Sequence, residues 1–285
     1  MNESKPFPND AKKQFRKLGA CSHTMAFLLN RQYGHQNRNA EKAADPLAGG
    51  INRQGYQCGM LWGATLAAGA ESYRRYGANS TAIGMAIVSS QEILRLFLEN
   101  VKSPDCIDIT DCNWNSKIDM AKFFITGRFR SCFKLIEKWA PQAFNTAEQA
   151  LASNPPVFST QPVSCASEVI RKLGGTEEEA TMVAGFAGGI GLSGNACGAL
   201  AAAIWYDALL YYRNQTGKKM YDMERGSKVL DKFYKASDYE ILCSKLCGKL
   251  FTSIDEHSQH VCSGGCEKLI WALTEQHKEC GQRKP

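Results

Sequence analysis

Apolar side chains recur every three or four residues along much of the chain, which is the period of amphipathic helices. The period is clearest over residues 80–101 and 221–236, and it also predicts helices over 12–31 and 40–48. Residues 176–179 read Thr-Glu-Glu-Glu, a capping-box sequence that opens a further helix. No run of alternating apolar and polar residues is long enough for a sheet. The predicted fold class is therefore all-α, with several helices in each half of the chain.

Residues 181–206 contain no charged side chain, and the stretch exceeds the ~20 residues that a helix needs to cross a bilayer. A membrane span requires continuous helix, whereas glycines, Ser193 and Asn195 interrupt this stretch. We therefore expect a buried glycine-rich turn, no membrane span, and a helix that begins at Cys197. The positive end of a helix lowers the pKa of a cysteine, so Cys197 suits either a reactive thiol or a metal ligand.

The glycine-rich turn occurs twice in the chain. Residues 48–58 and 187–197 both begin Ala-Gly-Gly-Ile, both have glycine at the eighth position, and both end in cysteine. Around this turn four cysteines recur in the same order in each half, at Cys21, Cys58, Cys106 and Cys132, and at Cys165, Cys197, Cys243 and Cys266. Their separations are 37, 48 and 26 residues in the first set and 32, 46 and 23 in the second. We interpret this as an internal duplication.

The duplication predicts two pseudo-symmetric multi-helix repeats. The N-terminal repeat covers residues 1–152 and the C-terminal repeat covers 163–285. Between them, residues 153–162 hold three of the nine prolines and form a natural linker, because proline ends helices.

Composition narrows the class of protein. Hydrophobic residues make up 44% of the chain and charged residues 22%, as in globular proteins, and the net charge of +6 is spread along the chain. Residues 12–17 form the only short basic run, which we interpret as a solvated helix face, so nucleic-acid binding is not expected. Because the first ten residues lack an apolar signal segment, we expect a cytoplasmic protein. Twelve cysteines in such a protein indicate metal or redox chemistry rather than a disulfide framework.

Four thiolates per repeat suit a zinc ion or an iron-sulfur cluster. Neither half has the Cys-x-x-Cys pairs that are typical of structural zinc. Free N–H groups in a glycine-rich turn can donate hydrogen bonds to cluster sulfur. The eight repeated cysteines are therefore candidate metal ligands, with Cys112, Cys247 and Cys262 as alternates. The candidate cofactor-binding glycines are Gly49, Gly50, Gly55, Gly188, Gly189 and Gly194.

Two other classes of function fit the same residues. One is a thiol-disulfide oxidoreductase or redox sensor that uses Cys197, or the pairs Cys243/Cys247 and Cys262/Cys266, whose members lie four residues apart. The other is a zinc- or copper-binding module. His257 and His260 fall in a stretch that we expect to be a surface loop, where they are solvated rather than ligating. Cys280, near the polar C-terminus, is expected to be a bystander. No phosphate loop, dinucleotide fingerprint or Ser-His-Asp pattern is present.

The second repeat resembles a known family through residues 184–200, Ala-Gly-Phe-Ala-Gly-Gly-Ile-Gly-Leu-Ser-Gly-Asn-Ala-Cys-Gly-Ala-Leu, together with Cys165, Cys243 and Cys266. This is the C_GCAxxG_C_C family of redox-active proteins, which includes the split-Soret cytochromes c; the first repeat looks like a more divergent copy. The resemblance implies a helical domain and, by analogy with the split-Soret members, an iron-sulfur cluster held by the motif cysteines. The core differs, because Gly198 follows Cys197 here where the family has Ala, and Arg53 replaces a small residue in the first turn. No Cys-x-x-Cys-His occurs, so covalent haem is not expected.

Together these features predict a redox or electron-transfer protein with one cysteine-ligated cluster per repeat, [2Fe–2S] favoured over [4Fe–4S]. They favour an electron carrier over a substrate-turnover enzyme, because no side-chain acid or base is needed. The expected partner is a redox protein of unknown identity, and homodimer formation stays open.

Overall fold

The computed structural model describes residues 6–214 and 221–275, and these residues form helices with no strand among them. The all-α prediction is thus confirmed. After α1 (Ala11–Leu18), the first repeat is built from seven α-helices and a short 3₁₀ turn. In chain order they are α2 (Cys21–Tyr33), α3 (Arg38–Lys42), η1 (Asp45–Leu47), α4 (Gly59–Tyr76), α5 (Ser80–Asn100), α6 (Cys106–Thr110), α7 (Lys117–Ile125) and α8 (Phe129–Ala152).

The second repeat follows the same order, and most of its helices are shorter. Its elements are α9 (Cys165–Lys172), α10 (Glu177–Met182), η2 (Ala184–Phe186), α11 (Gly198–Asn214), α12 (Met223–Ala236), α13 (Cys243–Leu246), α14 (Ile254–Cys262) and α15 (Glu267–Thr274). Thus α2 corresponds to α9, α4 to α11, α6 to α13 and α8 to α15. The chain consists of two repeats of one helical unit.

Two predicted helices differ from the observed ones. The helix expected over 12–31 is broken at Gly19, whose φ of 84° cannot continue a right-handed helix. The helix expected over 40–48 is instead the end of α3 followed by the 3₁₀ turn η1, which contains Pro46. The capping box at the start of α10 is confirmed, since Thr176 and Glu179 each accept from the other's backbone N–H.

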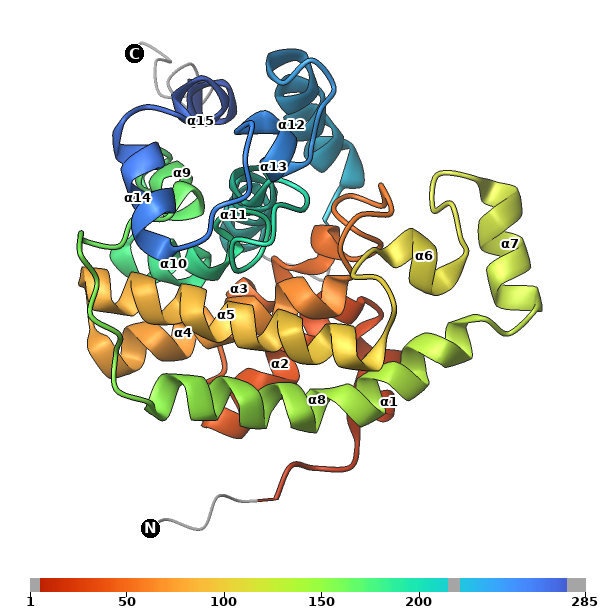
Figure 1. The fold of residues 1–285 in the computed structure, drawn as a ribbon. Coiled ribbons are helices and arrows are strands. Elements are labelled where there is room, and N and C mark those ends of the chain that lie inside the picture. Colours follow the sequence, from red (N-terminus) through yellow and green to blue (C-terminus); the bar gives the residue numbers. More distant parts are fainter. Residues whose placement is uncertain (1–5, 215–220, 276–285) are drawn as a thin grey trace.

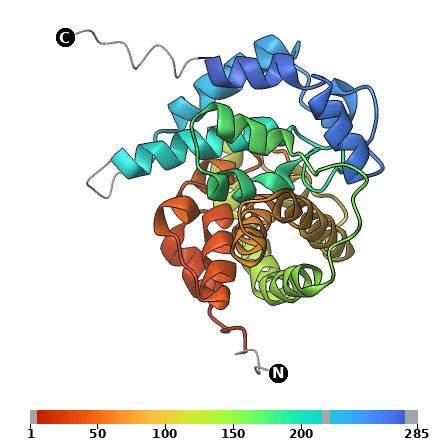
Figure 2. The same ribbon diagram turned by 90° about the vertical axis from the view of Figure 1, so that its left-hand side faces the viewer.

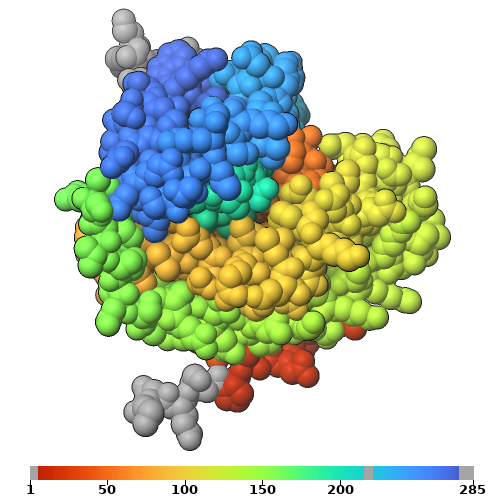
Figure 3. Space-filling view, in the orientation of Figure 1, coloured from red at the N-terminus to blue at the C-terminus, as the bar shows by residue number. Residues whose placement is uncertain are grey.

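One hydrophobic core runs through both repeats. Helices α4, α5 and α8 pack side by side, and Figure 2 looks along them. The second repeat lies across this layer, as the ribbon and the space-filling view both show (Figures 1 and 3). At the junction, Trp62 meets Phe186 edge-on with ring centroids 4.9 Å apart, and Trp205 Nε1 donates to the Ala40 carbonyl at 3.0 Å.

The proline-containing segment 153–162 connects α8 to α9 along the side of the molecule (Figure 1). It is held at two points. Phe158 packs against Gly84 of α5, and Asp255 of α14 accepts the backbone N–H groups of Ser159 and Thr160 at 3.0 Å. This attachment places the start of α9 next to α14.

Helix α5 is long and apolar enough to cross a membrane by length and composition, and it is the only such helix in the described part of the chain. Within its most apolar window, 61% of the residues are buried inside the protein, against α4 and α8. Its apolar sequence is accounted for by its central place in the core.

Candidate metal centres

The four repeated cysteines of the first half all lie at helix starts. Cys21 is the first residue of α2, Cys58 is the N-cap of α4, Cys106 is the first residue of α6, and Cys132 lies in the first turn of α8. Helix N-termini carry unpaired N–H groups and a partial positive charge, which taken alone favour the thiolate form of a cysteine.

A short backbone bridge clamps two of these helix starts together. The Cys58 N–H donates to the Pro104 carbonyl at 2.7 Å, and the Cys106 N–H donates to the Tyr56 carbonyl at 2.7 Å. The Ile107 N–H donates to the Gly55 carbonyl at 3.0 Å. These contacts hold Cys58 and Cys106 on neighbouring backbones although they lie far apart in the sequence.

The second repeat reproduces the same clamp. The Cys197 N–H donates to the Ile241 carbonyl at 2.9 Å, and the Cys243 N–H donates to the Asn195 carbonyl at 2.7 Å. The isolated bridges Gln57–Asp105 and Ala196–Leu242 are its two copies. The duplicated sequence therefore yields a duplicated arrangement of cysteine-bearing backbones.

The glycine-rich turns serve in two different ways. The backbone N–H groups of Gly49 and Gly188 reach the sulfurs of Cys21 and Cys165 respectively, and each helps to lower the pKa of that cysteine. Gly50 and Gly189 instead allow the turn to close, because an added Cβ would lie 2.3 Å from the Tyr56 nitrogen in one and 2.6 Å from the Asn195 oxygen in the other. Gly55 and Gly194 also have no space for a side chain. An added Cβ would lie 3.0 Å from Ile107, which follows Cys106, or 3.0 Å from Ser244, which follows Cys243.

The sulfurs of the first repeat interact with one another. A hydrogen bond with Cys58 lowers the pKa of Cys21, and the same contact together with burial raises the pKa of Cys58. Burial and the neighbouring Cys21 charge raise the pKa of Cys106 and of Cys132 to about 12. Trp114 Nε1 donates to Cys106 Sγ at 3.3 Å. Of these four thiols only Cys21 has a lowered pKa, so thiolates at the other three would need a cation to offset their charge.

The second repeat brings together five cysteines. A hydrogen bond with Cys266 lowers the pKa of Cys165. Cys243 Sγ and Cys247 Sγ lie 3.9 Å apart, and hydrogen bonds with Cys243 and Cys266 lower the pKa of Cys247 to about 3. Because Cys247 takes part in these contacts, this alternate lies inside the second cluster of sulfurs.

Cys197 departs from the expectation of a lowered pKa at a helix start. Burial, followed by the charge of Cys165, raises its pKa to about 12, although the Leu200 and Ala199 N–H groups act in the opposite direction. Desolvation outweighs the helix terminus at this position. The sulfur is therefore not an exposed, activated nucleophile, whereas a bound cation would favour its thiolate.

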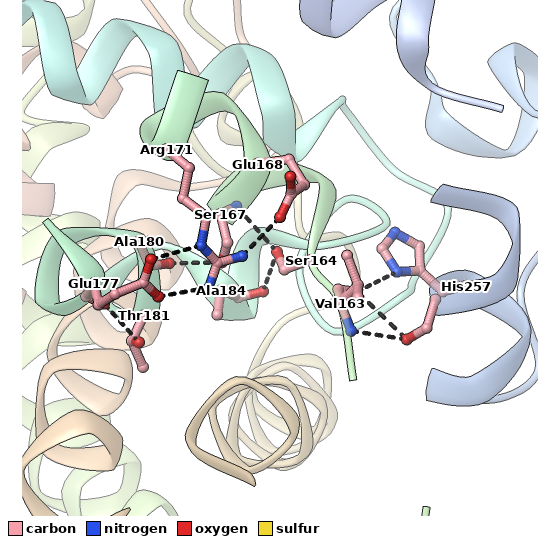
Figure 4. Close-up of polar contacts among 11 residues, drawn as sticks. Val163, Ser164, Ser167, Glu168, Arg171, Glu177, Ala180, Thr181, Ala184 and His257 are labelled. Atoms are coloured by element: carbon pink, nitrogen blue, oxygen red, sulfur yellow. Dashed lines mark hydrogen bonds and ion pairs between the residues drawn. The ribbon is translucent and has the colours of Figure 1, made fainter. Parts of the chain in front are cut away.

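The prediction that His257 and His260 lie in a solvated surface loop is wrong. Both lie on α14, and the His257 side chain is fully buried. Its Nδ1 donates to the Val163 carbonyl at 3.2 Å (Figure 4). Burial of the ring lowers the pKa of His257, but the hydrogen bond with Cys165 and the charge of that thiol outweigh burial, so that the pKa is raised. The sequence held one signal for this helix, because Ser253 caps it by accepting the Glu256 N–H.

The segment before α9 fixes the place of Val163 beside α14. Ser164 is the N-cap of α9, and its hydroxyl donates to the Ala184 carbonyl at 3.0 Å (Figure 4). Ser258 accepts the Val163 N–H at 2.9 Å. Cys165 thus reaches the second cluster from a helix start that is tied both to α14 and to the first residue of η2.

Within the described part of the chain, one group of side chains lies close enough together to hold a metal ion. The ligand atoms of Cys247, His260 and Cys266 all lie within 4.8 Å of one another. Of the other two alternates, Cys112 is buried and near enough to Cys132 to affect its pKa, whereas Cys262 is exposed on α14. Cys280 lies outside the described residues.

Comparison with known families gives two matches along the chain. The model of the family described as "Putative redox-active protein (C_GCAxxG_C_C)" matches residues 20–144 and again residues 163–280. The chain belongs to the C_GCAxxG_C_C family. No curated protein and no solved structure matches it. The two matches are two copies of the family domain in one C_GCAxxG_C_C chain, and each copy contains one of the clusters of cysteines described above.

Proposed function

We propose that this C_GCAxxG_C_C protein is an electron carrier that holds one cysteine-ligated iron-sulfur cluster in each repeat. The observation that carries the proposal is the duplicated convergence of four cysteines at helix starts, with the same backbone clamp in both repeats. The eight ligands are those of the sequence motif, and [2Fe–2S] is the favoured cluster type. When bound, such a cluster supplies one-electron chemistry.

The residues of the chain would bind and tune the cluster. Backbone N–H groups of Gly49 and Gly188, and the indole N–H of Trp114, donate toward ligand sulfur. Hydrogen bonds to sulfur and exclusion of water are two of the means by which proteins set a cluster potential. The ligand sulfurs are mostly buried, which excludes water, and no proton has to be moved by a side chain.

The proposal also includes a partner and a cellular location. The partner is a redox protein, without a role for nucleic acid or a membrane span, and the location is cytoplasmic. The modest net charge of +6 and the burial of the apolar helix α5 support these choices.

A thiol-disulfide function is the second candidate, and the contact between Cys243 and Cys247 favours it. Their sulfurs are 3.9 Å apart, and Cys247 has a lowered pKa. In this reaction the two thiols would lose two protons and two electrons to an acceptor disulfide, which becomes a dithiol as the Cys243–Cys247 bond forms. A zinc or copper module is the third candidate, supported by the group Cys247, His260 and Cys266.

Anaerobic purification followed by a visible spectrum and by iron and sulfide assays tests the proposal. We expect a coloured protein with about two iron and two sulfide per repeat. Cys58→Ser and Cys197→Ser should each remove the metal of one repeat, while Cys262→Ser, at an exposed position, should leave both. A colourless protein without iron would rule the proposal out.

Alkylation separates the second candidate from the first. Cysteines that react in the native protein without metal favour thiol-disulfide chemistry, whereas cysteines that become reactive only after chelation or acid favour ligation.

A further inference from the structure

The two repeats surround their cysteine clusters with different side chains. Helices α7 and α14 occupy the same place in the order of elements, and both begin at a capping serine. Ser116 accepts the Asp119 N–H, and Ser253 accepts the Glu256 N–H. Counting from these two caps aligns the helices α7 and α14 residue by residue. Phe123 then corresponds to His260.

Ring contacts support this alignment. Two residues before the caps stand Trp114 and Phe251. Trp114 meets Phe123 with ring centroids 4.9 Å apart, and Phe251 meets His260 with centroids 5.1 Å apart. The same pair of aromatic positions is thus retained, with an imidazole in place of a benzene ring in the second repeat.

A second position also gains a possible metal ligand in the second repeat. Cys247 lies four residues after Cys243, and its counterpart four residues after Cys106 is Thr110. The Thr110 hydroxyl donates to the Cys106 carbonyl at 2.6 Å and so serves its own helix. The second repeat therefore has a sulfur and an imidazole where the first has a helix-bound hydroxyl and a phenyl ring.

The imidazole of His260 is placed to act as a ligand. Its ring lies close enough to Cys247 to help lower the pKa of that thiol. Its Nε2 is buried with no oxygen or nitrogen partner among the described residues, an arrangement that is costly for a polar atom unless a ligand completes it. Gly265 makes room for the ring, since an added Cβ would lie 2.2 Å from His260 Nε2. The ligand atoms of Cys247 and Cys266 lie within 4.8 Å of His260 and of each other, as the donors around one ion must.

We propose that Cys247, His260 and Cys266 bind metal together in the second repeat, so that the protein has one all-sulfur site and one mixed sulfur-nitrogen site. This inference rests on the proposed function only in assuming that the sites bind metal. Where the metal belongs to an iron-sulfur cluster, ligation by the neutral imidazole of His260 instead of one motif thiolate would give the second site the higher reduction potential. The duplication would then have produced two unequal centres rather than two copies of one.

Titration of the metal-free, reduced full-length protein with Co²⁺ alone tests the inference, because the visible bands of bound Co²⁺ depend on its sulfur and nitrogen donors. Cys58→Ser serves as the background, since it removes a first-repeat ligand and leaves the second site intact. In that background, His260→Phe gives the second repeat the side chain of Phe123. We expect the bands to shift and Co²⁺ affinity to fall by about 10-fold or more.

Phe123→Leu in the same background is the matched control and should change neither the bands nor the affinity. His260→Gln, checked by circular dichroism, separates the loss of a ligand from misfolding, and it should behave as His260→Phe does. Unchanged bands and affinity in both His260 variants would overturn the inference. Iron and sulfide in the purified protein report on the proposed function separately, because the Co²⁺ result does not depend on them.

Discussion

A glycine follows the capping cysteine in both repeats, and its missing side chain leaves space for the site. At Gly59 an added Cβ would lie 2.6 Å from Cys21 Sγ, and at Gly198 it would lie 1.8 Å from the Phe186 carbonyl oxygen. This crowding accounts for the order Cys-Gly in this chain where the family motif has Cys-Ala. The residue after the cysteine is fixed by the neighbouring sulfur or carbonyl, and not by the backbone conformation of the helix.

Gly59→Ala should therefore disturb the first site. We expect it to lower the free energy of unfolding by about 1–3 kcal/mol, because the new methyl group overpacks against a buried sulfur. The metal content should fall toward that of one repeat. Urea unfolding and metal analysis measure the two effects.

Gly174→Ala is the control for this variant, because nothing lies within 4 Å of its added Cβ. Its φ of 83° costs about 1 kcal/mol for a non-glycine residue, with no effect on metal content. A Gly59→Ala protein with full metal content and unchanged stability would contradict the role given to this glycine.

At the scale of elements, α1 is attached to α2 by an ion pair. Asp10, at the start of α1, accepts two hydrogen bonds from Arg31 in the last turn of α2, at 2.7 and 2.8 Å. The Arg31 hydrogen bond holds the pKa of Asp10 at about 2, below its ordinary value of 3.8. Both side chains are partly shielded, with exposed fractions of 28% for Asp10 and 23% for Arg31. The pair allows α1 to fold back against α2 after the break at Gly19.

Asp10→Asn should lower the free energy of unfolding by about 1–2 kcal/mol at pH 7. Because the folded pKa lies below the unfolded one, the carboxylate stabilises the fold above pH 4, and its contribution is lost as the pH falls toward 2. The difference between the variant and the original protein should therefore shrink as the pH falls from 4 to 2. Denaturant unfolding across this range measures it, and a difference that does not depend on pH would contradict the assignment.

At the scale of the whole molecule, the two repeats do not have separate interiors. Trp62 packs on Phe186, Gln57 Nε2 donates to the Gly189 carbonyl at 3.1 Å, and the Tyr56 and Tyr234 hydroxyls share a hydrogen bond of 2.7 Å. Each contact joins a residue of one repeat to a residue of the other. Unfolding one repeat would expose the core of the second, so we expect them to unfold as one cooperative unit.

Trp62→Ala tests this cooperativity. We expect a loss of about 3–5 kcal/mol in a single transition, because a large buried side chain is removed from the shared core. Trp271→Ala on α15, where the ring is 58% exposed, should change the stability by less than about 0.5 kcal/mol. Circular dichroism during urea unfolding gives the result. Two separate transitions, with only one moved by Trp62→Ala, would show independent repeats.

Much of the element order could be read from the sequence because helix period and capping are local properties. The helices over 80–101 and 221–236 are observed within two residues of their predicted ends, and the capping box at 176–179 is present. The break at Gly19 was missed because a single glycine can also lie within a helix. Its positive φ turns the chain between α1 and α2, and α1 then packs against both α2 and α8.

The sequence predicted as ligands the cysteines that occur at equivalent positions in both repeats. The first and second turns match position by position, so cysteines in equivalent places could be identified without a structure. The counterparts of Cys247 and His260 in the first repeat are Thr110 and Phe123, which are not metal ligands, so repetition gives no signal for them. Their proximity to Cys266 depends on how α13, α14 and the start of α15 pack.

By itself the sequence determined the helical class, the duplication and the cysteines at its helix starts. The spacing of apolar residues and the similarity of the two halves can both be read along the chain. Only the tertiary structure decided that the two repeats share one core and that α14 turns His257 and His260 inward. Which face of a short helix is buried depends on its neighbours, and the neighbours of α14 include Val163 and Ser159, nearly a hundred residues earlier in the chain. Long-range packing of this kind leaves no local pattern in the residues that it buries.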